Sequence, residues 1–188
     1  MKKLIVFIAF IVSAVCAYSQ TDKMAAKESR KGYRGFVDLS GEALFERKYS
    51  NDRDIVYSAS GITTTHGYQF NEHFFVGGGA GISFLTYNFK DQGATFGIDC
   101  PIFAAGRADW KIGKVPLFAD LRVGTFITSR TGHNDDRMFI SPVIGYHCSW
   151  GRKVSLNIGA GLSFHLIDRY HDSGWEMMPS VRIGIEFN

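Results

Sequence analysis

The sequence predicts an all-β protein, an eight-stranded antiparallel up-and-down transmembrane β-barrel. Apolar residues alternate with polar or very small ones in eight separate segments from Tyr33 onward, and no helical period competes with them there. Short and long connections alternate between these segments. Glycine, with 21 residues, and the aromatic residues, at 14%, are both plentiful, as a small barrel requires.

The first twenty residues have the pattern of a secretory signal peptide. Two lysines precede an apolar run (4–15) that is too short and wrongly flanked for a spanning helix. Cleavage is expected after Ala17 or, alternatively, after Gln20. Acylation of Cys16 is a weaker alternative because the residue before it is a bulky valine. The predicted organisation is a signal peptide (1–20), a short periplasmic lead-in (21–31) and a barrel (32–188).

Charge and cysteine content exclude several classes of protein. Removing Lys2 and Lys3 lowers the formal net charge from +3 to +1, so electrostatics gives no reason to expect nucleic-acid binding. No later segment is apolar enough for a transmembrane helix. Two cysteines remain, Cys100 and Cys148, too few for a fold built on disulfides. They fall near opposite ends of their strands, roughly 25 Å apart, so we expect free thiols.

The alternation defines the strands and the two kinds of connection between them. We expect strands at about 33–44, 55–69, 74–87, 99–110, 116–128, 138–150, 153–168 and 175–187. Tight turns are expected at 70–73, 111–114 and 151–152, and longer polar segments at 45–54, 88–98, 129–137 and 168–174. Two unlike ends are typical of an outer-membrane-type barrel with short periplasmic turns and longer extracellular loops.

A soluble barrel with its apolar face inward has the same period, but three features favour the inverse arrangement. The non-apolar faces carry glycine, serine and asparagine, which fit the narrow interior of eight strands. Charges of both signs lie mid-strand on those faces, where they can pair across the lumen. Aromatic residues gather at the strand ends, as in interfacial girdles. Leu156, Ile158 and Leu162 are therefore expected to meet lipid.

Two sets of residues follow from this orientation. The expected lumen charge network comprises Asp38, Glu42, Arg107, Asp109, Asp120, Arg122, Arg182 and Glu186. The expected aromatic girdles comprise Trp110, Trp150 and Phe187 at the short-turn end, and Tyr87, Tyr170 and Trp175 at the long-loop end. Because side chains fill the interior, the barrel should be closed to solutes, with Arg122 and Arg182 each bridging carboxylates of neighbouring or opposite strands.

Several segments carry a family resemblance: THGYQFNEHFFVGGGAGISF (65–84), PLFADLRVG (116–124), ISPVIGYHCSW (140–150) and the closing SVRIGIEFN. From about Tyr33 to its end the chain resembles the small outer-membrane β-barrel family of Gram-negative bacteria, similar in architecture to OmpX and OmpA. The resemblance implies an outer-membrane location. The expected partners are outer-membrane lipid, lipopolysaccharide and the barrel-insertion machinery, around a monomer. One departure is that Asn188 follows Phe187, whereas such barrels usually finish on the aromatic residue.

Two motifs suggest chemistry at first sight. VGGGAG (76–81) lacks the third glycine of a nucleotide-binding fingerprint and no helix follows, so its inward glycines indicate close packing. Ser163 and His165 share the inward face, but the strand rise places residues two apart at roughly 7 Å, too far for general-base chemistry. Lipid A would also approach from the outer surface. We therefore expect no enzyme.

No cofactor or metal is expected either. The histidine groups His165 with His171, and His66 with Glu72 and His73, have no recognised metal-ligand spacing. The acidic stretch HNDD (133–136) is most simply a solvated loop tip, with calcium binding as a minor alternative.

The sequence thus predicts a non-enzymatic outer-membrane barrel that displays extracellular loops for structural or interaction roles, such as adhesion or contact with a host or with the envelope. A narrow channel for small solutes is the first alternative, and a lipid A-modifying enzyme is a less favoured one. The sequence names no extracellular ligand.

Overall fold

The computed structural model describes residues 31–48, 54–89, 93–128, 137–150, 154–169 and 172–187. Their side chains are described in 31–43, 57–86, 94–127, 138–148, 154–166 and 174–187. The predicted signal peptide and all but the last residue of the lead-in lie outside the described residues, as do His171 and the HNDD stretch.

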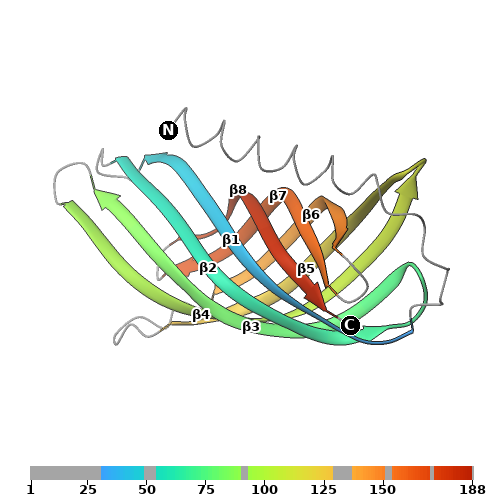
Figure 1. Ribbon diagram of the computed structural model, residues 1–188. Helices are drawn as coiled ribbons and strands as arrows, with labels where there is room; N and C mark the ends of the chain where they lie inside the picture. The colour runs from blue at the N-terminus through green and yellow to red at the C-terminus, as the bar shows by residue number, and fades with distance from the viewer. Residues whose placement is uncertain are drawn as a thin grey trace.

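These residues form one closed barrel in which every strand pairs antiparallel with its neighbours in sequence and β8 returns to pair with β1 (Figure 1). The fold class predicted from the sequence is confirmed. In the described part of the chain, no helix is long and apolar enough to cross a membrane. The strands are β1 (Gly32–Lys48), β2 (Asp54–Gln69), β3 (Phe74–Phe89), β4 (Gly93–Ile112), β5 (Val115–Thr128), β6 (Arg137–Trp150), β7 (Val154–Arg169) and β8 (Asp172–Phe187).

The strands are longer than the sequence predicted. β1 and β2 stay paired out to Lys48 and Asp54, and β3 and β4 out to Phe89 and Gly93. The extents predicted for the long segments 45–54, 88–98 and 168–174 were therefore wrong, since only 49–53, 90–92 and 170–171 separate the strands there. Polar and glycine-rich strand ends lack apolar alternation, but the ladder hydrogen bonds join backbone groups and do not require it.

The strands are also longer than a membrane requires. They run from 14 to 20 residues, whereas about 9 to 11 tilted residues cross the hydrocarbon core. The paired hairpins are therefore longer than the hydrocarbon core of a bilayer would require.

The two faces of the wall have the predicted orientation. Apolar side chains such as Leu39, Ile62, Val123 and Ile183 point outward and are 39–61% exposed. The inward face carries the buried charged and hydroxyl side chains together with large phenylalanines, among them Phe36, Phe75, Phe103 and Phe118. The exterior is thus suited to lipid and the interior to polar pairing.

Inward glycines leave space for these rings and for the neighbouring strand. A Cβ atom at Gly77 would lie 2.5 Å from the His66 carbonyl oxygen and 2.7 Å from Cζ of Phe75. A Cβ atom at Gly106, on the outer face, would meet nothing within 4 Å. The glycines of VGGGAG that point inward therefore have a packing role, as expected.

The ladder that closes the barrel is short. β1 pairs with β8 only from Gly35↔Phe187 to Glu42↔Ser180, whereas β7 pairs with β8 along nearly its whole length. β1 and β8 lie side by side in Figure 1. At one end of this ladder the Phe187 ring lies over Gly35, whose Cβ would be 2.6 Å from Cζ of that ring, and meets the His66 ring edge-on.

No disulfide joins Cys100 to Cys148, as predicted. Cys100 is exposed on the outer face of β4, whereas Cys148 is buried on β6. No disulfide contributes to the stability of the barrel wall in the part of the chain that the structure describes.

Candidate functional site: the charged lumen

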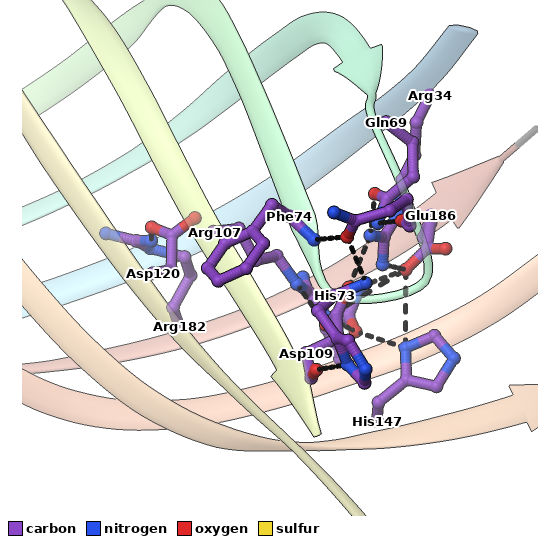
Figure 2. A network of polar contacts seen from close by, with 12 residues as sticks. Arg34, Gln69, His73, Phe74, Arg107, Asp109, Asp120, His147, Arg182 and Glu186 are labelled. Atoms are coloured by element: carbon purple, nitrogen blue, oxygen red, sulfur yellow. Dashed lines mark hydrogen bonds and ion pairs between the residues drawn. The ribbon is translucent and has the colours of Figure 1, made fainter. Parts of the chain in front are cut away.

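The turn end of the barrel is the end with the 70–73 and 113–114 turns, where β1 begins and β8 ends. Near it, Arg34 of β1 donates to Asp109 Oδ2 at 2.5 Å and to Glu186 Oε2 at 2.8 Å. Arg107 of β4 donates to Asp109 Oδ1 at 2.8 Å and to Asn157 Oδ1 at 2.9 Å. Figure 2 shows the side chains of Arg34, Arg107, Asp109 and Glu186 gathered in one network. We call Arg34, Gln69, Arg107, Asp109, His147, Asn157 and Glu186 the turn-end cluster.

Glu186 is the acceptor at the centre of that cluster. It is 1% exposed and lies 3.3 Å from His147 Nδ1, in addition to its bond with Arg34. Asn157 Nδ2 donates to the same carboxylate at 3.4 Å. A carboxylate so far from solvent is tolerated only when hydrogen-bond donors surround it, and strands β1, β6 and β7 supply them here, with the Arg34 guanidinium as the cation.

A second group, the central cluster, lies one step farther along the lumen. It comprises Asp38, Asp120, Arg122 and Arg182, and Figure 2 shows Asp120 and Arg182 well apart from Glu186. Arg122 of β5 pairs with Asp38 of β1, on the opposite side of the barrel, and with Asp120 of its own strand at 3.1 Å. Arg182 of β8 pairs with the same Asp120. Two arginines and two aspartates, all at most 8% exposed, thus join three strands across the lumen.

Aromatic rings lie against the guanidinium groups of both clusters. The Arg107 guanidinium carbon stands 3.9 Å from the Phe118 ring centroid and 5.0 Å from that of Phe36. That of Arg122 is 4.7 Å from the centroid of Phe103. Such stacking stabilises a cation where water is excluded. The lumen at these levels is therefore filled by alternating charged pairs and rings.

Toward the other end, the loop end, a smaller group forms. Ser163 Oγ lies 2.9 Å from His165 Nε2, so the sequence-based estimate that this pair is too far apart was wrong. Side chains two apart on one strand face can lean toward each other, and the long imidazole covers the difference. Glu42 Oε2 lies 3.1 Å from the same His165 nitrogen. We call Glu42, Ser163 and His165 the loop-end triad.

The triad does not have the arrangement of a catalytic relay. A relay needs the carboxylate on one imidazole nitrogen and the hydroxyl on the other, whereas both partners of His165 contact Nε2. Ser163 is also 0% exposed. The geometry favours a structural link between β1 and β7 that passes over the intervening β8.

A cavity of about 40 Å³ lies between the central cluster and the loop-end triad. It is lined by charged groups, by hydroxyls and by aromatic rings, among them Glu42, Arg122, Phe126, Ser141, His165 and Arg182. Since one water needs about 10–15 Å³ measured in this way, the cavity has room for two to four waters. That volume is far below a continuous aqueous pore.

No protein-family model matches the chain, and no curated protein matches it. Solved structures do. Neisserial surface protein A (NspA) is 14% identical, with a TM-score of 0.50, over 86% of this chain and 99% of its own. The fold is that of a small Gram-negative outer-membrane barrel. The outer membrane protein AlkL is 11% identical with a TM-score of 0.48, over 89% of this chain and 92% of its own. An outer membrane channel from Pseudomonas putida F1 is 10% identical with a TM-score of 0.39, over 88% and 100%.

In this barrel the structure brings the expected charges into three groups rather than one. Asp38, Asp120, Arg122 and Arg182 meet in the central cluster, Arg107, Asp109 and Glu186 in the turn-end cluster, and Glu42 in the loop-end triad. Sequence reasoning missed Arg34, His147 and Asn157 as members. The sequence could have identified them by their position on the inward face of a strand. Arg34, for example, lies four residues before Asp38 on the same strand, and an even spacing places two side chains on the same face.

The other expected residues are placed as follows. Of the expected girdle residues, Trp175 is 55% exposed, and Trp110 and Phe187 are partly exposed. The side chains of Tyr87 and Trp150, and the whole of Tyr170, lie outside the described residues. His66 contacts Tyr33 and Thr64, and His73 contacts the Asp109 carbonyl oxygen. Within the described residues, no three metal-binding side chains gather at one point.

Proposed function

We propose that this protein is a non-catalytic outer-membrane barrel with a closed lumen, acting through the hairpins at its loop end in structural or interaction roles such as adhesion or envelope contact. The observation that carries the proposal is the central cluster. Its Asp38–Arg122 pair joins diametrically opposite strands, and the cavity above it measures about 40 Å³.

The long strands support the interaction part of the proposal. The β1–β2 and β3–β4 hairpins remain paired to their described ends, beyond the length needed to span lipid. A paired hairpin presents its tip with less conformational freedom than a free loop, which reduces the entropy lost on binding.

Conductance tests the closed lumen. Purified full-length protein in planar bilayers should give no steady current, while a porin in the same membranes provides the positive control. A reproducible open state of the wild type would contradict the proposal and favour the channel.

Lipid analysis tests the absence of catalysis. Overproduction of the wild type and of Ser163→Ala should leave the same lipid A mass spectrum as an empty vector. A new lipid A species that requires Ser163 would overturn the non-catalytic assignment.

The interaction role has its own test. Residues 49–53 and 90–92 can be exchanged for glycine–serine segments of equal length, with an equal exchange of residues 151–153, which join β6 to β7 at the turn end, as the control. Loss of cell adhesion or of envelope association is expected only for the loop-end exchanges. Equal loss in the control, or no loss in any variant, would contradict it.

A further inference from the structure

The β4–β5 hairpin at the turn end presents an unusual surface. Lys111, Ile112, Gly113, Lys114 and Val115 are all exposed, with Ile112 at 65% and Val115 at 46%. Only Gly113 and Lys114 separate the two strands, and Gly113 has a positive φ of 62°, which glycine adopts without strain. The tip is therefore a tight turn that carries two apolar and two cationic side chains.

The apolar part of the tip continues the lipid-facing wall. Ile112 and Val115 are cross-strand partners, and the next outward pair along the hairpin is Trp110 with Leu117. All four side chains share the outer face, so the apolar surface extends without interruption to the end of the hairpin. An exposed isoleucine–valine pair at a turn is unfavourable in water and favourable at a membrane interface.

The cationic part has no carboxylate partner within the described residues. Asp109, two residues before Lys111, is engaged by Arg34 and Arg107 inside the lumen. Neither Lys111 nor Lys114 forms an ion pair with a described side chain. An ammonium group on a flexible lysine stem next to an apolar pair can reach phospholipid phosphates while that pair enters the interface.

The β2–β3 turn at the same end exposes the apolar Phe70 and Phe74, at 53% and 56%, but carries no lysine. Asn71 Oδ1 there accepts from the backbone N–H groups of His73 and Phe74 at 2.8 and 2.9 Å, and the His73 ring contacts the Asp109 carbonyl oxygen. This turn also carries the acidic Glu72. The basic apolar tip is thus particular to β4–β5 and not a general property of the described turns.

We propose that the β4–β5 hairpin is a docking site for anionic phospholipid headgroups in the leaflet at the turn end. Ile112 and Val115 enter the interfacial region and pack on acyl chains, while Lys111 and Lys114 bind the phosphate. The inference rests on the proposed outer-membrane placement, and it adds a partner class and the residues that select it. Each lysine close to an anionic surface strengthens binding about fivefold at low salt.

Short-chain phospholipids test this in solution. The full chain in zwitterionic micelles is titrated with dihexanoyl-phosphatidylglycerol, dihexanoyl-phosphatidylcholine or inorganic phosphate, and the Gly113 and Lys114 amides are followed by NMR. Phosphatidylglycerol should bind at least fivefold more tightly than phosphatidylcholine. Inorganic phosphate should give no saturable shift, because it lacks the chains that pack on Ile112.

Variants separate the two parts of the site. Lys111→Gln/Lys114→Gln should abolish the preference for phosphatidylglycerol, the double arginine variant should retain it, and Ile112→Ser should weaken both lipids alike. Lys31→Gln, which removes an exposed lysine outside the hairpin, is the matched control and should leave the preference unchanged.

Three results would overturn the proposal: no preference in the wild type, a preference that survives in the double glutamine variant, or an equal response to inorganic phosphate. The conductance test of the closed lumen does not depend on this hairpin, so failure of one proposal is distinguishable from failure of the other.

Discussion

The two halves of the lumen are filled in different ways. In the half toward the turn end, arginines from β1, β4, β5 and β8 bind carboxylates across the barrel, and phenylalanine rings fill the space beside inward glycines. In the half toward the loop end, a single described histidine–carboxylate pair stands beside a hydroxyl-lined cavity of about 40 Å³. The turn-end half is therefore held by more ion pairs than the loop-end half. Substitutions in the turn-end half should lower the free energy of unfolding more than substitutions in the loop-end half.

The largest effect is expected for Arg122→Ala. Its removal breaks the ion pair of Asp38 and one of the two ion pairs of Asp120, and these two residues are only 3% and 7% exposed. Breaking a buried pair in this way costs about 3–5 kcal/mol. Urea unfolding in lipid vesicles, followed by heat-modifiable gel mobility, should show the loss. Lys114→Ala, at an exposed site, should change the midpoint little, and an equal loss in both variants would contradict the comparison.

A smaller effect is expected for Gly77→Ala, which tests the packing of the turn-end half. The new methyl group would press on the His66 carbonyl oxygen and on the Phe75 ring, and overpacking of this kind costs about 1–3 kcal/mol. Gly106→Ala is the matched control, since nothing lies within 4 Å of its Cβ position. If both alanine variants unfold at the wild-type midpoint, the backbone and the Phe75 ring around Gly77 can shift to accept a methyl group without loss of stability.

Glu42→Gln tests the loop-end half. The amide keeps the shape of the side chain but removes the charge that faces His165 at 3.1 Å. A charge-assisted bond contributes about 1.5–3 kcal/mol, and part of it survives as a neutral hydrogen bond, so a loss of about 1 kcal/mol is expected. The same unfolding assay applies. A loss as large as that of Arg122→Ala would show that the polar contacts of the two halves stabilise the barrel equally.

The smallest effect is expected for Ser163→Ala. Its hydroxyl contacts His165, which keeps Glu42 as a partner, so the loss should be about 0.5 kcal/mol, the lower end of what a neutral hydrogen bond contributes. Ser155→Ala, at another buried serine of β7 that lies toward the turn end, provides the comparison. A loss above about 2 kcal/mol for Ser163→Ala would mean that the loop-end triad stabilises the barrel by more than one neutral hydrogen bond at Ser163 can explain.

Sequence periodicity was sufficient for the number of strands and for the direction of each face. Val123 and Arg122 are adjacent in sequence, and a period of two places one in lipid and the other in the lumen. It also placed Asp38 and Arg122 in one interior, but not against each other. Their pairing depends on the stagger of β1 relative to β5. This stagger is the sum of the register shifts between neighbouring strands around the barrel, and the sequence of neither strand determines it.

The same reason explains the glycine–phenylalanine contacts that sequence did not reveal. Gly79 of β3 faces the Phe103 ring of β4, and Gly145 of β6 faces the Phe118 ring of β5. Each pair belongs to two strands whose register is fixed only when the sheet forms. Phe36, Phe103 and Phe118 also place apolar bulk on the inward face, which weakens the alternation that identified the polar side.

The short closing ladder has a consequence for how the barrel opens. Beyond Glu42↔Ser180, the described backbone of β1 and β8 pairs only with β2 and β7 respectively, so at the loop end each becomes the free margin of a sheet. Amide protons on such a margin exchange with water more readily than those held on both sides. The Glu42–His165 contact crosses β8 at the point where the closing ladder stops. Separation of β1 from β8 should therefore begin at the loop end. The Glu42–His165 contact must break before the hydrogen bonds of the closing ladder can break.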